Sequence, residues 1–156
     1  MEVFVTLKIW ELTSIVLSAL VGGMYWGPWL GLSRSMRKFK PEVFLEIVDQ
    51  MNRNMESVMT ILTPVALLSI APVLFFSYSG QPRTFFLTLT GFALFIVALL
   101  VTMLVEVPIV KQIVTWTAGT LPGNWQQLRD RWGAFHIIRV VAGIGGLALI
   151  VAGAIF

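Results

Sequence analysis

Four long apolar stretches divide the sequence, at about residues 10–33, 57–77, 84–106 and 133–155. Each is long enough to cross the hydrocarbon core of a bilayer as a helix, which takes about 20 residues. Short polar connections separate the stretches, so consecutive helices are expected to run antiparallel. The pattern predicts an all-α fold, an integral membrane four-helix bundle with up-down-up-down topology. Residues 1–156 then form a single transmembrane domain.

Amphipathic segments precede the second and fourth of these spans. Between residues 44 and 59 the apolar side chains recur at helical spacing. Asn52 and Glu56 lie four positions apart there, which places them as a polar pair on one helix face. A helix from Trp125 is expected to run unbroken to Ile155. The second and fourth helices therefore acquire amphipathic juxtamembrane extensions.

Prolines mark the expected breaks in two helices. Pro28 cannot donate a backbone hydrogen bond, so the first helix is expected to kink or end near Trp26 and Trp29. Aromatic anchoring at the membrane interface and an aromatic wall facing a ligand are both open interpretations of these tryptophans. Pro108 follows Glu106 and marks the expected end of the third helix.

Small residues form stripes on the first and fourth spans. In the first span they recur every four positions, at Ala19, Gly23, Gly27 and Gly31. The fourth span carries a comparable set, which includes Gly143, Gly145, Gly146 and Ala152. Such stripes let helix backbones approach closely. They predict tight helix packing and a homo-oligomer through the glycine-rich faces of helices 1 and 4.

The composition supports a membrane protein. Hydrophobic residues make up 57% of the chain and charged residues only 12%, whereas soluble domains carry about 25% charged residues. Cysteine is absent, which excludes disulfides, thiolate metal sites and thiol catalysis. The net charge of +3 is carried beside the spans, so the basic residues are expected to meet anionic lipid headgroups rather than nucleic acid. The lipid bilayer and a lipophilic small molecule are the expected partners.

Lysine and arginine are distributed unequally between the two sides of the bundle. The side with the first and third connections holds Arg34, Arg37, Lys38, Lys40, Arg53, Lys111, Arg129 and Arg131. The other side holds Lys8 and Arg83. The positive-inside rule therefore predicts cytoplasmic first and third connections and both termini outside. The expected location is a bacterial inner membrane.

Most of the chemically versatile side chains are expected at this same basic side of the bundle. The four helix ends that meet there carry Trp26, Trp29, Asn52, Glu56, Glu106, Trp132, His136 and Arg139. Ionisable groups within a membrane span are costly and are retained mainly for partners or function. Trp132, His136 and Arg139 are three or four positions apart, so they share one helix face. The sequence predicts a polar pocket at the cytoplasmic end, with this face pointing inward.

The roles of the charged residues allow several interpretations. Arg139 is expected to pair with Glu56 or Glu106, either to fix helix register or as part of a functional site. His136 is the chain's single histidine. It is a hydrogen-bonded structural residue, a general base or polarising donor for a substrate, or a metal or haem ligand. No metal motif accompanies it, so no cofactor is predicted, with haem or a single metal at His136 as the alternative.

Four sequence blocks carry a family resemblance. They are GGMYWGPWLGL, QMNRNM, EVPIVKQIVTW and NWQQLRDRWGAFHIIRVV. The chain resembles the anthrone oxygenase-like family of small four-helix integral membrane proteins, formerly a domain of unknown function. The family pattern of a tryptophan, a histidine four later and an arginine three after that falls on Trp132, His136 and Arg139. Where the family commonly has an asparagine, this chain has Val110.

The resemblance implies oxidation of an activated methylene in a fused aromatic to a ketone by dioxygen, without a cofactor. His136 would act as the base, and Arg139 or Trp132 would stabilise the developing oxyanion. We therefore expect a membrane-embedded oxidoreductase for a lipophilic aromatic or quinone-like substrate. The expected catalytic residues are His136, Arg139, Glu106 and Glu56, and the expected substrate-binding residues are Trp26, Trp29, Asn52 and Trp132. The alternative is a non-enzymatic small membrane protein, either an assembly partner or a lipid- or ligand-binding subunit.

Overall fold

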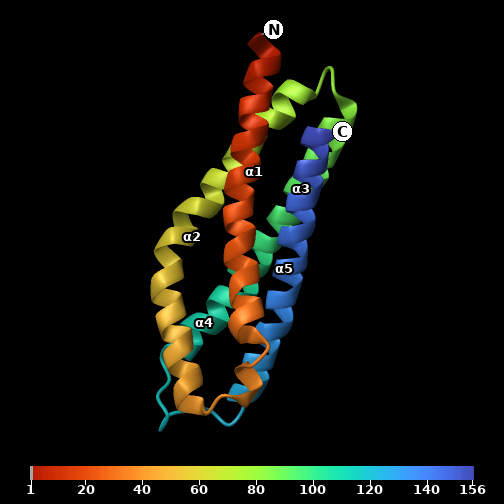
Figure 1. Ribbon diagram of the computed structural model, residues 1–156. Coiled ribbons are helices and arrows are strands. Elements are labelled where there is room, and N and C mark those ends of the chain that lie inside the picture. The colour runs from red at the N-terminus through yellow and green to blue at the C-terminus, as the bar shows by residue number, and fades with distance from the viewer. Residues whose placement is uncertain (1) are drawn as a thin grey trace.

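The computed structural model describes residues 2–156 as a bundle of long helices without strands (Figure 1). Its α-helices are α1 Glu2–Pro28, α2 Pro41–Ser77, α3 Pro82–Val101, α4 Val107–Ile113 and α5 Trp125–Ile155. Four helical segments are long and apolar enough to cross a membrane, namely Phe4–Lys38, Pro41–Ser77, Pro82–Ile113 and Trp125–Ile155. The predicted all-α membrane four-helix bundle is confirmed. Met1 of the predicted domain lies outside the described residues.

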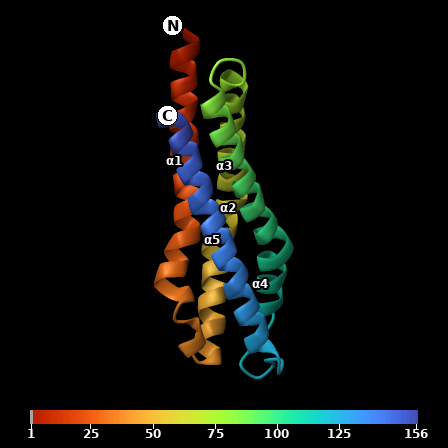
Figure 2. The same ribbon diagram turned by 90° about the vertical axis from the view of Figure 1, so that its right-hand side faces the viewer.

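The two ends of the bundle differ in what they carry. Both chain termini lie at one end, and the first and third connections lie at the other (Figures 1 and 2). We call these the terminal end and the basic end. Helix α1 packs against α2 and α5, and α3 packs along α5. Helices α2 and α5 begin well before their predicted spans, at Pro41 and Trp125, so the juxtamembrane extensions are continuous with the membrane helices.

The first proline acts as predicted. Helix α1 ends at Pro28, and the chain continues as a π-helical turn, Trp29–Ser33, followed by a 3₁₀ turn, Met36–Lys38. Pro28 lacks the N–H that an α-helix needs at this position. Within the π turn that follows, the Ser33 hydroxyl donates to the Pro28 carbonyl at 3.3 Å. The chain thereby bends over the basic end before α2 begins.

The third helix does not end at Pro108, which corrects the prediction. A π-helical turn, Thr102–Glu106, connects α3 directly to α4. The Val107 N–H donates to the Thr102 carbonyl, five residues earlier. Such wider turns are rare and occur frequently at functional sites. The turn lets the helix continue past a residue that cannot donate, so Glu106 lies within a continuous helical segment.

Glycines bring α3 and α5 into backbone contact. A Cβ added to Gly91 would lie 2.7 Å from the Gly146 carbonyl oxygen, and one added to Gly146 would lie 2.9 Å from the Gly91 oxygen. Near the terminal end, a Cβ on Gly153 would lie 2.9 Å from Thr88 Oγ1. The small residues of α5 are therefore engaged inside the chain.

The stripe of small residues on α1 lies on the outside of the bundle. Gly23, Gly27 and Gly31 face outward, and within residues 2–156 no atom lies within 4 Å of a Cβ added to any of them. The predicted homo-oligomer stays a prediction. Among the described residues the α1 stripe is open, whereas the corresponding α5 glycines already pack against α1 and α3.

Two apolar clusters form the core, and the fourth membrane helix joins them. One cluster in the middle of the bundle includes Val140, and another toward the basic end includes Trp132. His136 lies on α5 between these two residues and is only 2% exposed. Trp132, His136 and Val140 follow one another at intervals of four residues, so they share one helix face. A polar group is thus held between two packed apolar clusters.

Candidate functional site

A cavity of about 530 Å³ lies between the helices toward the basic end. Its walls come from α1, α2, the segment from α3 through the π turn to α4, and α5. This volume falls within the usual range for small-molecule sites, about 300–1,000 Å³. All four membrane segments therefore contribute to one internal space.

Three ionisable side chains meet in the wall of this cavity. Glu106 is 3% exposed, and its Oε1 lies 3.2 Å from Nδ1 of His136. Arg139 forms an ion pair with Glu106 through Nη1 and Oε2. Its Nη2 lies 2.8 Å from His136 Nδ1. The carboxylate that pairs with Arg139 is thus Glu106, one of the two candidates that the sequence left open.

Local helix geometry explains this arrangement. His136 and Arg139 are three residues apart on α5, and that spacing places both on the face toward α3. Glu106 is the buried residue of the π turn. Thr102 opens the same turn, and its hydroxyl accepts a hydrogen bond from Arg139 Nη1 at 3.4 Å. The π turn therefore supplies two ligands for one guanidinium.

Tyr25 of α1 completes the surroundings of Arg139. The guanidinium carbon lies 4.6 Å from the centroid of the Tyr25 ring, which is a cation–π geometry. Gly143 makes room for this ring, because a Cβ there would lie 2.9 Å from Tyr25 Cδ2. Sequence reasoning missed Tyr25. The available signal was Gly143, which lies one turn beyond Arg139 on the same face and indicates a close neighbour.

The charges within this group compensate each other. Glu106 and Arg139 form a buried pair of opposite charge, and removal of either partner leaves the other without its counter-ion. His136 Nε2 is buried and has no hydrogen-bond partner among residues 2–156. One ring nitrogen of a cavity-lining histidine is therefore without a hydrogen-bond partner in the described part of the chain.

The contacts of His136 Nδ1 select opposite tautomers. A hydrogen bond to Glu106 requires a proton on Nδ1, whereas a hydrogen bond from Arg139 requires a lone pair there. In the first tautomer Nε2 carries the lone pair and can accept a proton. In the second, Nε2–H is a donor that can polarise a carbonyl. The arrangement is thus chemically suited to a base or to a donor.

Some of the remaining predicted site residues line this cavity and others lie elsewhere. Asn52, Glu56 and Trp132 line the cavity. Asn52 Nδ2 donates to Glu56 Oε2 at 3.2 Å, and the rings of Trp132 and His136 have centroids 6.0 Å apart. Trp26 is 46% exposed and Trp29 lines a second cavity. The structure therefore does not bring these two tryptophans to the 530 Å³ cavity.

Methionines form much of the apolar wall. Five of the seven methionines in the sequence line this cavity, namely Met24, Met51, Met55, Met59 and Met103. Those on α2 are spaced by four residues, which was a usable sequence signal for a common face. Thioethers are flexible and make favourable contacts with aromatic rings. Val110 also lines the cavity, so the wall is apolar where the family commonly has an asparagine.

The residues that could bind a metal are already engaged with a cation. Among residues 2–156, no three His, Cys, Asp or Glu side chains are grouped as a metal site. Glu106 and His136 Nδ1 both contact the Arg139 guanidinium. The expectation that no cofactor is needed stays a prediction.

Comparison with known proteins identifies the family. The family model for anthrone oxygenase matches residues 51–149. This chain belongs to the anthrone oxygenase family. The match covers more than half of the sequence and includes the buried pair of Glu106 and Arg139, together with His136, whereas Tyr25 lies outside it. No curated protein and no solved structure gave a significant match. The family resemblance expected from the sequence is confirmed.

Proposed function

We propose that this member of the anthrone oxygenase family is a membrane-embedded oxidoreductase that oxidises an activated ring methylene of a lipophilic polycyclic aromatic to a ketone. One observation carries the proposal. A buried histidine, whose Nδ1 contacts both Glu106 and Arg139 and whose Nε2 has no hydrogen-bond partner in the described part of the chain, lines a cavity of about 530 Å³ among membrane helices. Apart from this group the cavity walls are mainly apolar, as a fused-ring substrate requires.

The lining supports a flat aromatic substrate that enters from the bilayer. Methionine side chains on α1, α2 and the π turn surround the cavity, and they can adjust to rings of different outline. Met103 is 57% exposed while it lines the cavity. We therefore assign substrate access to the part of the cavity wall that Met103 forms, at the outer surface of the bundle.

The proposed reaction begins with proton transfer to His136. In the competent tautomer Nδ1–H donates to Glu106, and Nε2 removes a proton from the methylene between the rings. The resulting carbanion is stabilised as an enolate, whose oxygen accepts hydrogen bonds from Arg139 or the indole N–H of Trp132. Dioxygen adds to the carbanion, the resulting peroxide anion takes the proton back from His136, and the hydroperoxide loses water. One methylene and one O₂ give one ketone and one H₂O.

Oxygen consumption by the purified protein in lipid nanodiscs tests this proposal, with anthrone as the probe and the ketone product measured in parallel. His136→Ala is expected to lower the rate by about 10²–10⁴-fold, the usual contribution of a general base. His136→Gln keeps a donor near the position of Nε2 without a base, so it should be equally slow. Substantial activity in the Gln variant alone would assign a polarising donor instead.

A matched control uses the tryptophans. Trp26→Phe changes a residue outside the cavity and should leave the rate unchanged, whereas Trp132→Phe removes an indole N–H from the cavity wall and should lower it. Full activity in His136→Ala would overturn the proposed base. Anthrone binding without any oxygen consumption by the wild type would favour the non-enzymatic ligand-binding alternative.

The proposed orientation places the basic end in the cytoplasm, in accordance with the lysine and arginine distribution. The absence of cysteine permits a direct test with single cysteines at Lys38 and Ser79. An impermeant maleimide should label Ser79→Cys in intact cells and Lys38→Cys only after permeabilisation. The reverse labelling pattern would invert the proposed orientation.

A further inference from the structure

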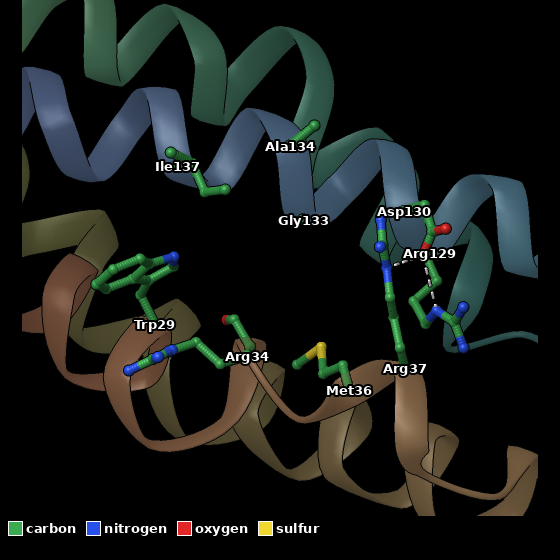
Figure 3. A pocket seen from close by; sticks show the side chains of 10 residues that line it. Trp29, Arg34, Met36, Arg37, Arg129, Asp130, Gly133, Ala134 and Ile137 are labelled. Atoms are coloured by element: carbon green, nitrogen blue, oxygen red, sulfur yellow. Dashed lines mark hydrogen bonds and ion pairs between the residues drawn. The ribbon is translucent and has the colours of Figure 1, made fainter.

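A second cavity, of about 330 Å³, lies between the π and 3₁₀ turns that follow α1 and the first turns of α5 (Figure 3). The lining residues on the α1 side are Trp29, Ser33, Arg34, Met36 and Arg37. Those on α5 are Arg129, Asp130, Gly133, Ala134 and Ile137. Except for Trp29, none of the predicted site residues lines it. Ser33 lines both cavities, so the two are neighbours.

Positive charge in this second cavity exceeds negative charge. Arg37 Nε lies 3.3 Å from Asp130 Oδ1, and Arg129 Nε lies 3.1 Å from the same oxygen. Arg34 forms no ion pair with a carboxylate in the described part of the chain, and its guanidinium carbon lies 6.0 Å from the Trp29 ring. Two guanidiniums therefore share one carboxylate, and the third has none in the described part of the chain. The side chain of Arg129 is 9% exposed, so part of this charge is held away from bulk water.

The ion-paired and apolar side chains lie toward opposite ends of the cavity. Figure 3 shows Trp29 and Ile137 on opposite walls at one end, with Arg34 extended beside Trp29, and Arg37, Arg129 and Asp130 at the other. Helix α5 runs from Asp130 through Ile137 into its membrane-spanning part. The end with Trp29 and Ile137 is thus the deeper one, and Arg37 and Arg129 lie nearer the basic surface. This gradient matches the order of head group and acyl chain in a phospholipid.

We propose that this cavity binds an anionic phospholipid, with the phosphate beside Arg37 and Arg129, Arg34 between head group and chain, and the first acyl carbons between Trp29 and Ile137. Planar guanidiniums suit phosphate oxygens because they can donate two parallel hydrogen bonds. Basic pockets between membrane helices are suited to acidic lipid head groups. A soluble anion would use the arginines alone, whereas a lipid also covers the apolar wall.

Native mass spectrometry of the full-length protein tests the proposal. The protein is purified in mild detergent with phosphatidylglycerol or with phosphatidylcholine of the same acyl chains, and the retained lipid is counted. The wild type should retain one phosphatidylglycerol and no phosphatidylcholine. Arg34→Gln/Arg37→Gln should lower retention by about tenfold or more, because each cation near a head group contributes appreciably to lipid attraction.

Lys38→Gln/Lys40→Gln is the matched control. It removes the same charge from the same connection, at exposed residues that do not line the cavity, and should retain the lipid. Equal losses in the two double variants would show diffuse surface attraction and would overturn the site. Unchanged retention in Arg34→Gln/Arg37→Gln would also overturn it. If millimolar inorganic phosphate displaces the lipid, the site takes a soluble anion and the lipid assignment is wrong.

Filling the cavity gives a second test with every arginine in place. Within residues 2–156 a Cβ on Gly133 would meet no atom within 4 Å, so Gly133→Leu is compatible with the helix and has the better helix propensity. It should lose phosphatidylglycerol while it remains helical by circular dichroism and monodisperse. Wild-type retention in this variant would place the lipid elsewhere.

Discussion

Two carboxylates, one near each end of the bundle, are equally buried but are held in different ways. Glu106 and Glu11 are each 3% exposed. Glu106 is paired across helices with Arg139 and His136. Glu11 is paired within α1, to Lys8 at 2.7 Å, and that lysine side chain is 42% exposed. One carboxylate joins two helices, and the other has its counter-ion one turn earlier on its own helix.

This difference indicates which buried charge serves a site. Lys8 retains access to water and also donates to the Ala154 carbonyl at 3.1 Å, near the C-terminus of α5, where helix carbonyls lack partners. Lys8 therefore connects α1 to α5 at the terminal end. Glu11 lines neither of the two cavities described here. Burial of a carboxylate is thus not sufficient to indicate a functional site, whereas interhelical pairing beside a cavity is more informative.

The largest effect is expected from Glu106→Gln. The substitution leaves the Arg139 guanidinium buried without its counter-ion, and such losses cost about 3–5 kcal/mol. Unfolding of the protein in detergent micelles, followed by circular dichroism, should show a correspondingly lower free energy of unfolding. Oxygen consumption with anthrone should be lost as well. A change below about 1 kcal/mol, the scale of an exposed pair, would remove the distinction between the two ends.

The double variant Glu106→Gln/Arg139→Gln should recover part of this loss. Both charges are then absent, so neither is left buried and unpaired, and residues in direct contact typically show a coupling of about 0.5–3 kcal/mol. The measurement is a double-mutant cycle that includes Arg139→Gln alone. Strict additivity of the two single effects would mean that the pair does not stabilise the fold as a unit.

At the terminal end we expect the loss of Lys8 to lower the free energy of unfolding more than the loss of Glu11. Lys8→Gln leaves the Glu11 carboxylate buried, and an unpaired buried polar group costs about 1–3 kcal/mol. The same unfolding experiment measures it, with Arg83→Gln as a control for loss of a cation at that end. Raising the salt concentration should change the wild-type value little, because the carboxylate itself is buried.

The smallest effect is expected from Glu11→Gln. Lys8 can then extend into water, so the loss should stay below about 1 kcal/mol, as for exposed ion pairs. A loss as large as that of Glu106→Gln would show that the terminal pair is as tightly integrated as the site, and the contrast between the ends would fail.

Hydropathy and spacing predicted the architecture well. Four apolar stretches with short connections gave the bundle, and the helical spacing of His136 and Arg139 correctly predicted a shared inward face. The choice between Glu56 and Glu106 was not accessible from sequence. The choice depends on the direction of the Glu106 side chain, which the π turn sets. The nearby proline is recognisable in the sequence, but the hydrogen-bond pattern of the π turn is not.

The aromatic residues of α1 show a second limit of sequence reasoning. Trp26, Trp29 and Tyr25 are close in sequence, but α-helical geometry separates neighbouring side chains by about 100°. Tyr25 lies beneath Arg139, while Trp26 is turned to the surface. The first span has small or aromatic residues on several faces, so its inward face could not be assigned without the packing of α5.

The π turn at Thr102–Glu106 also bears on how the chain tolerates changes in length. Such a turn contains one residue more than the α turn it replaces. A single deletion within it can close the backbone into a regular helix and keep the apolar span intact. A deletion in the regular part of α3, by contrast, rotates every later residue by about 100° and would turn Glu106 away from Arg139. The π turn is therefore the place where the chain can change its length by one residue while Glu106 stays on nearly the same face.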